Sequence, residues 1–280
     1  MWATHLRGFA RRQPLGLVGA CLVIAVLVAA AFAPVLAPSD PGDIRVSSVF
    51  VPPGIDFLLG TDKLGRDLLS RILYGARVAL IVGFGSVFFG VTAGTVVGIL
   101  SGYLKGRFDL TVQRCVDAAM ALPTLVLALI MAAVLGPSTL NVAIAVGLVM
   151  IPHAVRVLRS SALGVSNETY VEAARATGCT LWRILFRHIA PQCIAPYIVL
   201  ATVQIGWAIV TEASLSFLGL GTPPDVPSWG GTLSIASREF LERAPWVAIF
   251  PGVAITLTVF GFNLLGDSLR DVLDPRLRGS

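Results

Sequence analysis

Residues 118–155 read AAMALPTLVLALIMAAVLGPSTLNVAIAVGLVMIPHAV and contain no Lys, Arg, Asp or Glu. A helix that crosses a bilayer needs about 20 predominantly apolar residues, so this run is too long for one crossing. The turn-forming residues Gly136-Pro137-Ser138-Thr139 interrupt it. The run therefore predicts a helical hairpin within a membrane, with spans near Thr111–Leu135 and Leu140–Leu158.

Four further apolar runs flank this hairpin, and each is long enough to cross a membrane once. The first exceeds the apolar core of about 7–15 residues of a cleaved signal peptide, which favours a retained span. Together with the hairpin they make six spans and predict an all-α membrane protein. The four runs place spans near Leu15–Leu36, Val78–Leu104, Pro191–Phe217 and Pro245–Gly266.

The composition excludes an ordinary soluble domain. Hydrophobic residues make up 55% of the chain, charged residues 13%, and the mean hydropathy is +0.82. The net charge of +5 does not indicate nucleic-acid binding, because the basic residues gather beside apolar runs. With the N-terminus inside, the inner segments hold fourteen Lys and Arg residues and the outer segments hold seven. This bias predicts that both termini lie inside. Membrane lipids are expected to surround the spans.

The spans divide the chain into three parts. Residues 1–76 form an N-terminal tail, the first span and an outer segment, residues 77–271 form a five-helix core, and residues 272–280 form a tail. The outer segment ends in Gly60–Arg71, where Thr61 or Asp62 suits the N-cap of a short helix. This pattern predicts an amphipathic helix on the outer membrane interface, and a packed connector without a direct role is the alternative.

An inner segment, residues 166–190, is predicted to form an elbow of two short helices. Ser166 or Asn167 suits the first N-cap, and Gly178 suits the left-handed position after the first helix. Thr180 suits the N-cap of the second helix, which Pro191 closes as the fifth span begins. Small, helix-forming residues beside Tyr and Trp favour a surface that a partner approaches closely, whereas the alternative is a solvated loop.

The elbow carries a spaced motif: Glu172-Ala173-Ala174, then Gly178, then Pro191. With this motif the chain resembles the permease subunits of binding-protein-dependent ABC importers, although His188-Ile189-Ala190 precedes the proline where that family has Ile-x-Leu. Five further stretches resemble C-type permeases of the dipeptide, oligopeptide, nickel and glutathione branch. They are Leu59–Asp62 with Gly65–Arg71, Tyr74–Arg77, Ser216–Gly221, Trp229-Gly230 and Phe262–Pro275.

The resemblance implies a type I ABC importer permease fold in the bacterial inner membrane. It implies a second, homologous permease, two cytosolic ATPase subunits and an extracytoplasmic substrate-binding protein as partners. The cargo would be di- or oligopeptides, or alternatively nickel chelates or glutathione. The chain itself would not be an enzyme, and ATP and Mg would be bound by the ATPase subunits.

The sequence shows no motif that indicates a cofactor bound by this chain itself. The sequence lacks a Gly-x-x-x-x-Gly-Lys-Ser/Thr loop, so ATP chemistry is expected to come from a partner. The four cysteines show no metal-ligand spacing and are interpreted as small apolar fillers. They are Cys21, Cys115, Cys179 and Cys193.

Three groups of residues are candidates for function. The resemblance makes the elbow the coupling surface for an ATPase subunit, and the membrane region offers Glu212 and Gln204 to a translocation path. Glu212 is the only carboxylate well inside a predicted span, and the alternative role is a structural hydrogen bond involving Thr211, Ser214 or the sister subunit. The coupling residues are Tyr170, Glu172, Ala173, Ala174, Arg175, Ala176, Gly178 and Trp182.

The outer loop 219–244, rich in Gly, Pro and polar residues, is the predicted docking region for the binding protein, or alternatively a lid. Its candidate residues are Asp225, Trp229, Arg238 and Glu239. Rival functions fit less well. An ion-coupled secondary transporter would need more intramembrane charges, and an enzyme would need a catalytic cluster, whereas Pro152 and His153 indicate a kink near the inner end of the fourth span. A membrane scaffold is the third alternative.

Overall fold

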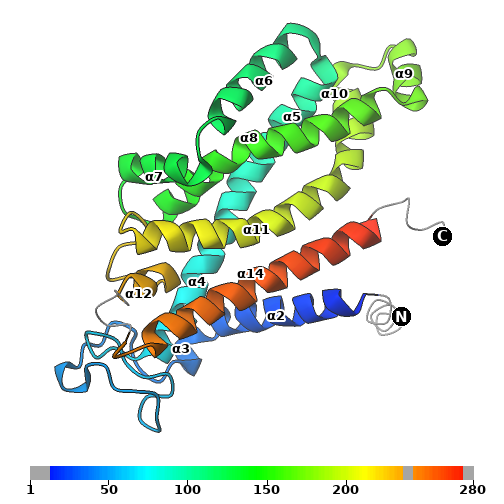
Figure 1. Ribbon diagram of the computed structural model, residues 1–280. Helices are drawn as coiled ribbons and strands as arrows, with labels where there is room; N and C mark the ends of the chain where they lie inside the picture. The colour runs from blue at the N-terminus through cyan, green and yellow to red at the C-terminus, as the bar shows by residue number, and fades with distance from the viewer. Residues whose placement is uncertain (1–12, 236–241, 274–280) are drawn as a thin grey trace.

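Figure 1 shows a computed structural model of the chain, which describes residues 13–235 and 242–273. Five described helices are long and apolar enough to cross a membrane, and one bent pair makes a sixth candidate. The predicted all-α membrane fold is confirmed. The start of the first long helix and the end of the last one lie at the same end of the molecule as the elbow (Figure 1).

The described helices follow one another through short connections, apart from the outer segment between the first two spans. Two π-helical segments, 87–91 and 185–189, and a 3-10 segment, 190–193, join neighbouring helices without a break. In chain order the helices are α2 (Pro14–Ala31), α3 (Ala33–Leu36), α4 (Leu68–Ser86), α5 (Thr92–Leu104), α6 (Gly106–Met120), α7 (Thr124–Leu135), α8 (Thr139–Ser166), α9 (Thr169–Ala176), α10 (Leu181–Ile184), α11 (Ile194–Phe217), α12 (Trp229–Ile235) and α14 (Trp246–Leu273).

The second span begins earlier than predicted. α4 and α5 form one helix that starts at Leu68 rather than near Val78, so the separate interfacial helix predicted at 60–71 is wrong. Asp67 is the N-cap, and its carboxylate accepts the Ser70 N–H at 2.8 Å. The prediction began at Val78 because Arg77 ends the uncharged run, whereas the helix continues toward its N-terminus past the exposed Arg77 and the buried Arg71.

The third span is bent by 91° between α6 and α7, so the predicted single helix Thr111–Leu135 is wrong. Pro123 lies at the bend, where its ring and missing N–H oppose a continuous helix. The fourth span, α8, continues past the predicted end at Leu158. Pro152 and His153 therefore lie in the middle of α8, and the expectation that they mark its inner end is wrong.

The hairpin turn and the elbow glycine are confirmed. Gly136 ends α7 at a φ of 82°, and Gly178 follows α9 at a φ of 77°, the left-handed region that glycine adopts without strain. Pro191 does not open a separate fifth span. It lies in the 3-10 segment that makes α10 and α11 one helix from Leu181 to Phe217.

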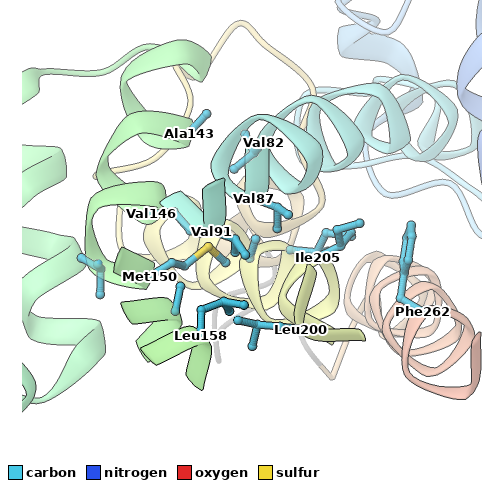
Figure 2. Close-up of a cluster of buried hydrophobic side chains, with 14 of the residues drawn as sticks. Val82, Val87, Val91, Ala143, Val146, Met150, Leu158, Leu200, Ile205 and Phe262 are labelled. Carbon is cyan, nitrogen blue, oxygen red and sulfur yellow. The ribbon is translucent and has the colours of Figure 1, made fainter. Parts of the chain in front are cut away.

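The core forms where α4, α5, α8, α11 and α14 pack together. Figure 2 shows its buried side chains, which include Val82, Val91, Met150, Ile205 and Phe262. α5 approaches α8 through small residues, as helices in membranes commonly do. The approach uses four glycines spaced by four residues, the first of them in the π-helical segment before α5: Gly90, Gly94, Gly98 and Gly102.

The contact between α5 and α8 leaves no room for larger side chains. A Cβ atom added at Gly94 would lie 2.5 Å from the Ala154 Cβ, and one added at Gly98 would lie 2.7 Å from the Val155 carbonyl oxygen. α2 packs against α14 in a similar way at Gly19. Figure 1 shows α2 and α14 at one edge of the molecule and α6 at the opposite edge, with α8 and α11 between them.

Candidate functional site

The first helix of the elbow, α9, is held by two buried side chains and exposes the rest. Val171 is fully buried and Ala174 is 8% exposed, whereas Glu172 and Ala173 are exposed. Because α8 runs through residue 166, the N-cap of α9 is Glu168 rather than the predicted Ser166 or Asn167. The elbow therefore presents a carboxylate and small side chains outward.

A pocket of about 350 Å³ lies between α9 and the helix that follows it. Tyr170, Ala173 and Ala174 line it on one side. Partial burial, reinforced by the negative charge of Glu168, raises the pKa of the Tyr170 phenol. The other side is basic, a feature that the sequence analysis missed although a four-residue spacing could have shown it. It consists of Arg183, Arg187 and His188.

Two predicted coupling residues face elsewhere. The Arg175 guanidinium lies over the Tyr103 ring of α5, 4.8 Å from its centroid. Trp182 stacks on Phe186 with ring centroids 6.0 Å apart, and both line an apolar groove with α5 instead of the elbow pocket. The structure thus brings together Tyr170 and the two alanines of the motif, while Arg175 and Trp182 belong to the contact with α5.

Polar contacts connect the elbow to the membrane core. The Lys105 ammonium donates to the Asn167 side-chain oxygen at 2.9 Å, which joins the end of α5 to the end of α8. Arg159 of α8 donates to both carboxylate oxygens of Asp109 in α6, at 2.5 and 2.6 Å. These contacts hold α5, α6 and α8 together where the elbow begins.

A second cavity, of about 270 Å³, lies at the bend between α6 and α7. α8 contributes Met150 and His153, and α11 contributes Gln204 and Trp207. All four lie away from the ends of helices that are long and apolar enough to cross a membrane. Gln204, a predicted translocation-path residue, thus lines a cavity within the membrane.

The bend itself is exposed. Met120 and Leu122 are 41% and 50% exposed, and none of the described side chains caps the first turn of α7. Non-helical backbone at membrane depth is tolerated where protein covers it or where it lines a water-filled space, because lipid offers no hydrogen bonds. This face of the chain therefore points toward water or another protein chain and away from lipid.

A polar stripe on α8 continues from the cavity toward the elbow. His153 and Ser160 are exposed, and so is Arg156, which pairs with Asp117 of α6 at 2.6 Å. The side chains of that pair are 49% and 50% exposed. A histidine within a span and an ion pair toward its inner end rarely face lipid, so the stripe marks the same water- or protein-facing side as the bend.

Glu212 does not join this cavity. It is 1% exposed, and one of its carboxylate oxygens accepts the Ser216 hydroxyl at 2.7 Å. The other oxygen has no hydrogen-bond partner among the described residues. Of the partners considered from the sequence, Thr211 and Ser214 donate to backbone carbonyls instead. Burial inside the subunit therefore separates Glu212 from the cavity that Gln204 lines.

The outer end of the molecule is stabilised by buried polar groups. Asp62 is fully buried and pairs with Arg66 at 2.8 Å, so these two charged side chains face inward. Trp229 is 2% exposed, and its indole N–H donates to the Ile72 carbonyl at 3.0 Å. This burial leaves Trp229 no side-chain surface for a docking partner.

Of the other three predicted docking residues, the structure describes one. Asp225 is exposed in the loop between α11 and α12. Arg238 and Glu239 lie outside the described residues.

An all-helical membrane subunit with an exposed elbow and a cavity at a broken span, lined by Gln204 and His153 among apolar residues, has an architecture that suits a transport protein. Its fold is similar to that of the MetNI methionine ABC transporter in an inward-facing conformation. That match has a TM-score of 0.62 and 18% identity, and it covers 73% of this chain and 96% of the other. The chain has the type I ABC importer permease fold.

Residues 94–279 match the model of the family described as binding-protein-dependent transport system inner membrane component, and the chain belongs to this family. Residues 1–53 match the N-terminal transmembrane domain of oligopeptide transport permease C. The chain is therefore a multi-pass permease subunit of an ABC transporter in the bacterial inner membrane, as the elbow motif predicted.

Three relatives resemble the chain along almost its whole length. A dipeptide transport system permease protein of Alkalihalophilus pseudofirmus is 40% identical over 96% of this chain and 88% of the relative. A di/tripeptide transport system permease protein of Pseudomonas aeruginosa is 41% identical over 94% of this chain and 88% of the relative. A glutathione transport system permease protein of Pectobacterium atrosepticum is 43% identical over 99% of this chain and 92% of the relative.

Proposed function

We propose that this chain forms half of the pathway through which an ATP-driven importer carries di- and oligopeptides across the inner membrane. A second, homologous permease forms the other half, and an extracytoplasmic binding protein delivers the peptide. Two cytosolic ATPase subunits bind ATP and Mg and hydrolyse the ATP. The di- and tripeptide permeases among the relatives support this cargo. Glutathione is the second candidate, supported by the relative that matches 99% of the chain.

The exposed elbow is the observation that carries the coupling proposal. Glu172 offers a charge-assisted hydrogen bond to an ATPase subunit, and Ala173 and Gly178 allow that subunit to approach closely. Beyond Gly178, the helix that starts at Leu181 is continuous with α11, which lines the membrane cavity. A displacement of the elbow therefore has a direct helical connection to the cavity, as rigid-body alternating access requires.

Gly178→Trp tests the coupling role, and Gly136→Trp is its matched control. Both glycines have a φ near +80°, and no described atom lies within 4 Å of a Cβ added at either. They lie at opposite ends of the membrane helices, with Gly178 at the elbow and Gly136 at the far end. We expect Gly178→Trp to abolish peptide transport and substrate-stimulated ATPase activity in the reconstituted complex, while Gly136→Trp retains both. Full activity of an intact Gly178→Trp complex would show that the elbow does not couple.

Glu212 has a structural role in this proposal, supported by its burial and its bond to Ser216. Glu212→Gln should then alter the transport of charged and neutral peptides to the same degree. A selective loss for peptides of one charge would instead assign Glu212 to the path. For the outer face, Asp225 remains a proposed docking residue. Asp225→Lys should weaken stimulation of the ATPase by the binding protein.

A further inference from the structure

We propose that the cavity at the bend between α6 and α7 binds the backbone amides of the transported peptide as one half of a two-subunit site. Gln204 and His153 would supply hydrogen bonds, and Trp207 would supply an apolar wall. The inference rests on the proposed peptide import and adds a location and residues to it.

The position of the cavity indicates contact with water. It opens beside the exposed bend, where Leu122 is 50% exposed and the backbone is not helical. His153 is exposed next to it in the middle of α8, and the exposed Arg156–Asp117 pair lies one helical turn further inward. A histidine, an ion pair and a broken helix on one face are costly against lipid, and their cost is removed by an aqueous path.

The chemistry of the lining suits peptides of differing sequence. The Gln204 amide offers a donor and an acceptor, as a peptide group does, and the His153 imidazole offers one of each when neutral. Met120, Met150 and Trp207 complete the wall. Thioether side chains adapt to differently shaped apolar groups, so the wall tolerates varied peptide side chains while the polar residues contact the constant backbone.

The size of the cavity indicates that it is incomplete in one subunit. Sites for small molecules usually enclose roughly 300–1,000 Å³ and surround most of the ligand. The cavity holds about 270 Å³ and is open at the bend. A second permease facing the exposed bend would enlarge and close it, which agrees with a pathway built from two homologous halves.

Cysteine labelling in the reconstituted complex tests the site. In a variant without the native cysteines, Gln204→Cys is compared with Val203→Cys. Val203 is the neighbouring residue, is 38% exposed, and lies about 100° away around the same helix. We expect a charged methanethiosulfonate to modify Gln204→Cys and not Val203→Cys, and millimolar dipeptide to slow the modification. Equal modification of both positions, or modification that dipeptide does not slow, would overturn the proposal.

A functional measurement keeps the two proposals distinguishable. Peptide uptake by the unmodified complex is measured first, and an absence of uptake would overturn the peptide-import proposal itself. Where uptake occurs, Gln204→Leu should lower the turnover by about two- to tenfold for each hydrogen bond lost, whereas Val203→Leu should leave it unchanged. Unchanged turnover in Gln204→Leu would overturn the half-site alone.

Discussion

Asp62→Ala should destabilise the outer segment by much more than the loss of one exposed carboxylate would. Asp62 is fully buried and accepts Arg66 Nε at 2.8 Å and the backbone N–H groups of Leu64 and Arg66 at 2.8 and 3.1 Å. Arg71, 2% exposed, lies 3.8 Å away and donates to the Pro41 carbonyl. Removing the carboxylate leaves two buried guanidinium groups without a counter-charge, which costs about 3–5 kcal/mol.

Hydrogen exchange measured by mass spectrometry gives the local unfolding free energy of residues 45–67. A loss of about 3–5 kcal/mol lowers the protection factors by roughly two to four orders of magnitude. Asp43→Ala is the matched control, because Asp43 also pairs with an arginine of this segment, at 2.9 Å, but the pair is 41% and 48% exposed. Its removal should cost at most about 1 kcal/mol. Equal protection in the two variants would refute the assigned role of the buried charges.

Four further variants address the packing described above. Gly94→Ala should destabilise the complex by about 1–3 kcal/mol, read as a lower melting temperature, because the new Cβ overlaps α8. Gly164→Ala, where no described atom lies within 4 Å, should instead stabilise it by about 0.5–1 kcal/mol. Trp229→Phe should cost about 0.5–1.5 kcal/mol in chemical unfolding through its lost hydrogen bond. Arg175→Ala should cost about 0.5–1 kcal/mol in the same assay through its lost contact with Tyr103.

Those parts of the fold that depend on local chemistry could be predicted from the sequence. Long uncharged runs marked the spans because lipid excludes unpaired charges, and Gly136 and Gly178 marked turns because both adopt a positive φ. The start of α4 could not be found in this way. Arg77 and Arg71 interrupt the apolar pattern, and the burial of Arg71 depends on Asp62 in a different segment.

The membrane cavity was only partly predictable. Gln204 was selected from its place within an apolar span, but the bend that accompanies it was missed because apolar length alone does not reveal a break. Pro123 within the run was the available signal. The four-residue spacing of glycines from Gly90 to Gly102 was a second signal that the sequence analysis did not use, and it marks the contact between α5 and α8. The burial of Trp229 depends on α4 and has no local signature.

The unbroken helix from Leu181 to Phe217 gives the subunit a mechanical property. At about 1.5 Å per residue, its 37 residues form a rod of roughly 55 Å. If the rod pivots near Gln204, a tilt of about 5° moves each end by about 2–3 Å in opposite directions. A small displacement of the inner end of the helix would then widen the translocation pathway at one end and narrow it at the other. The cargo would stay near the pivot at Gln204.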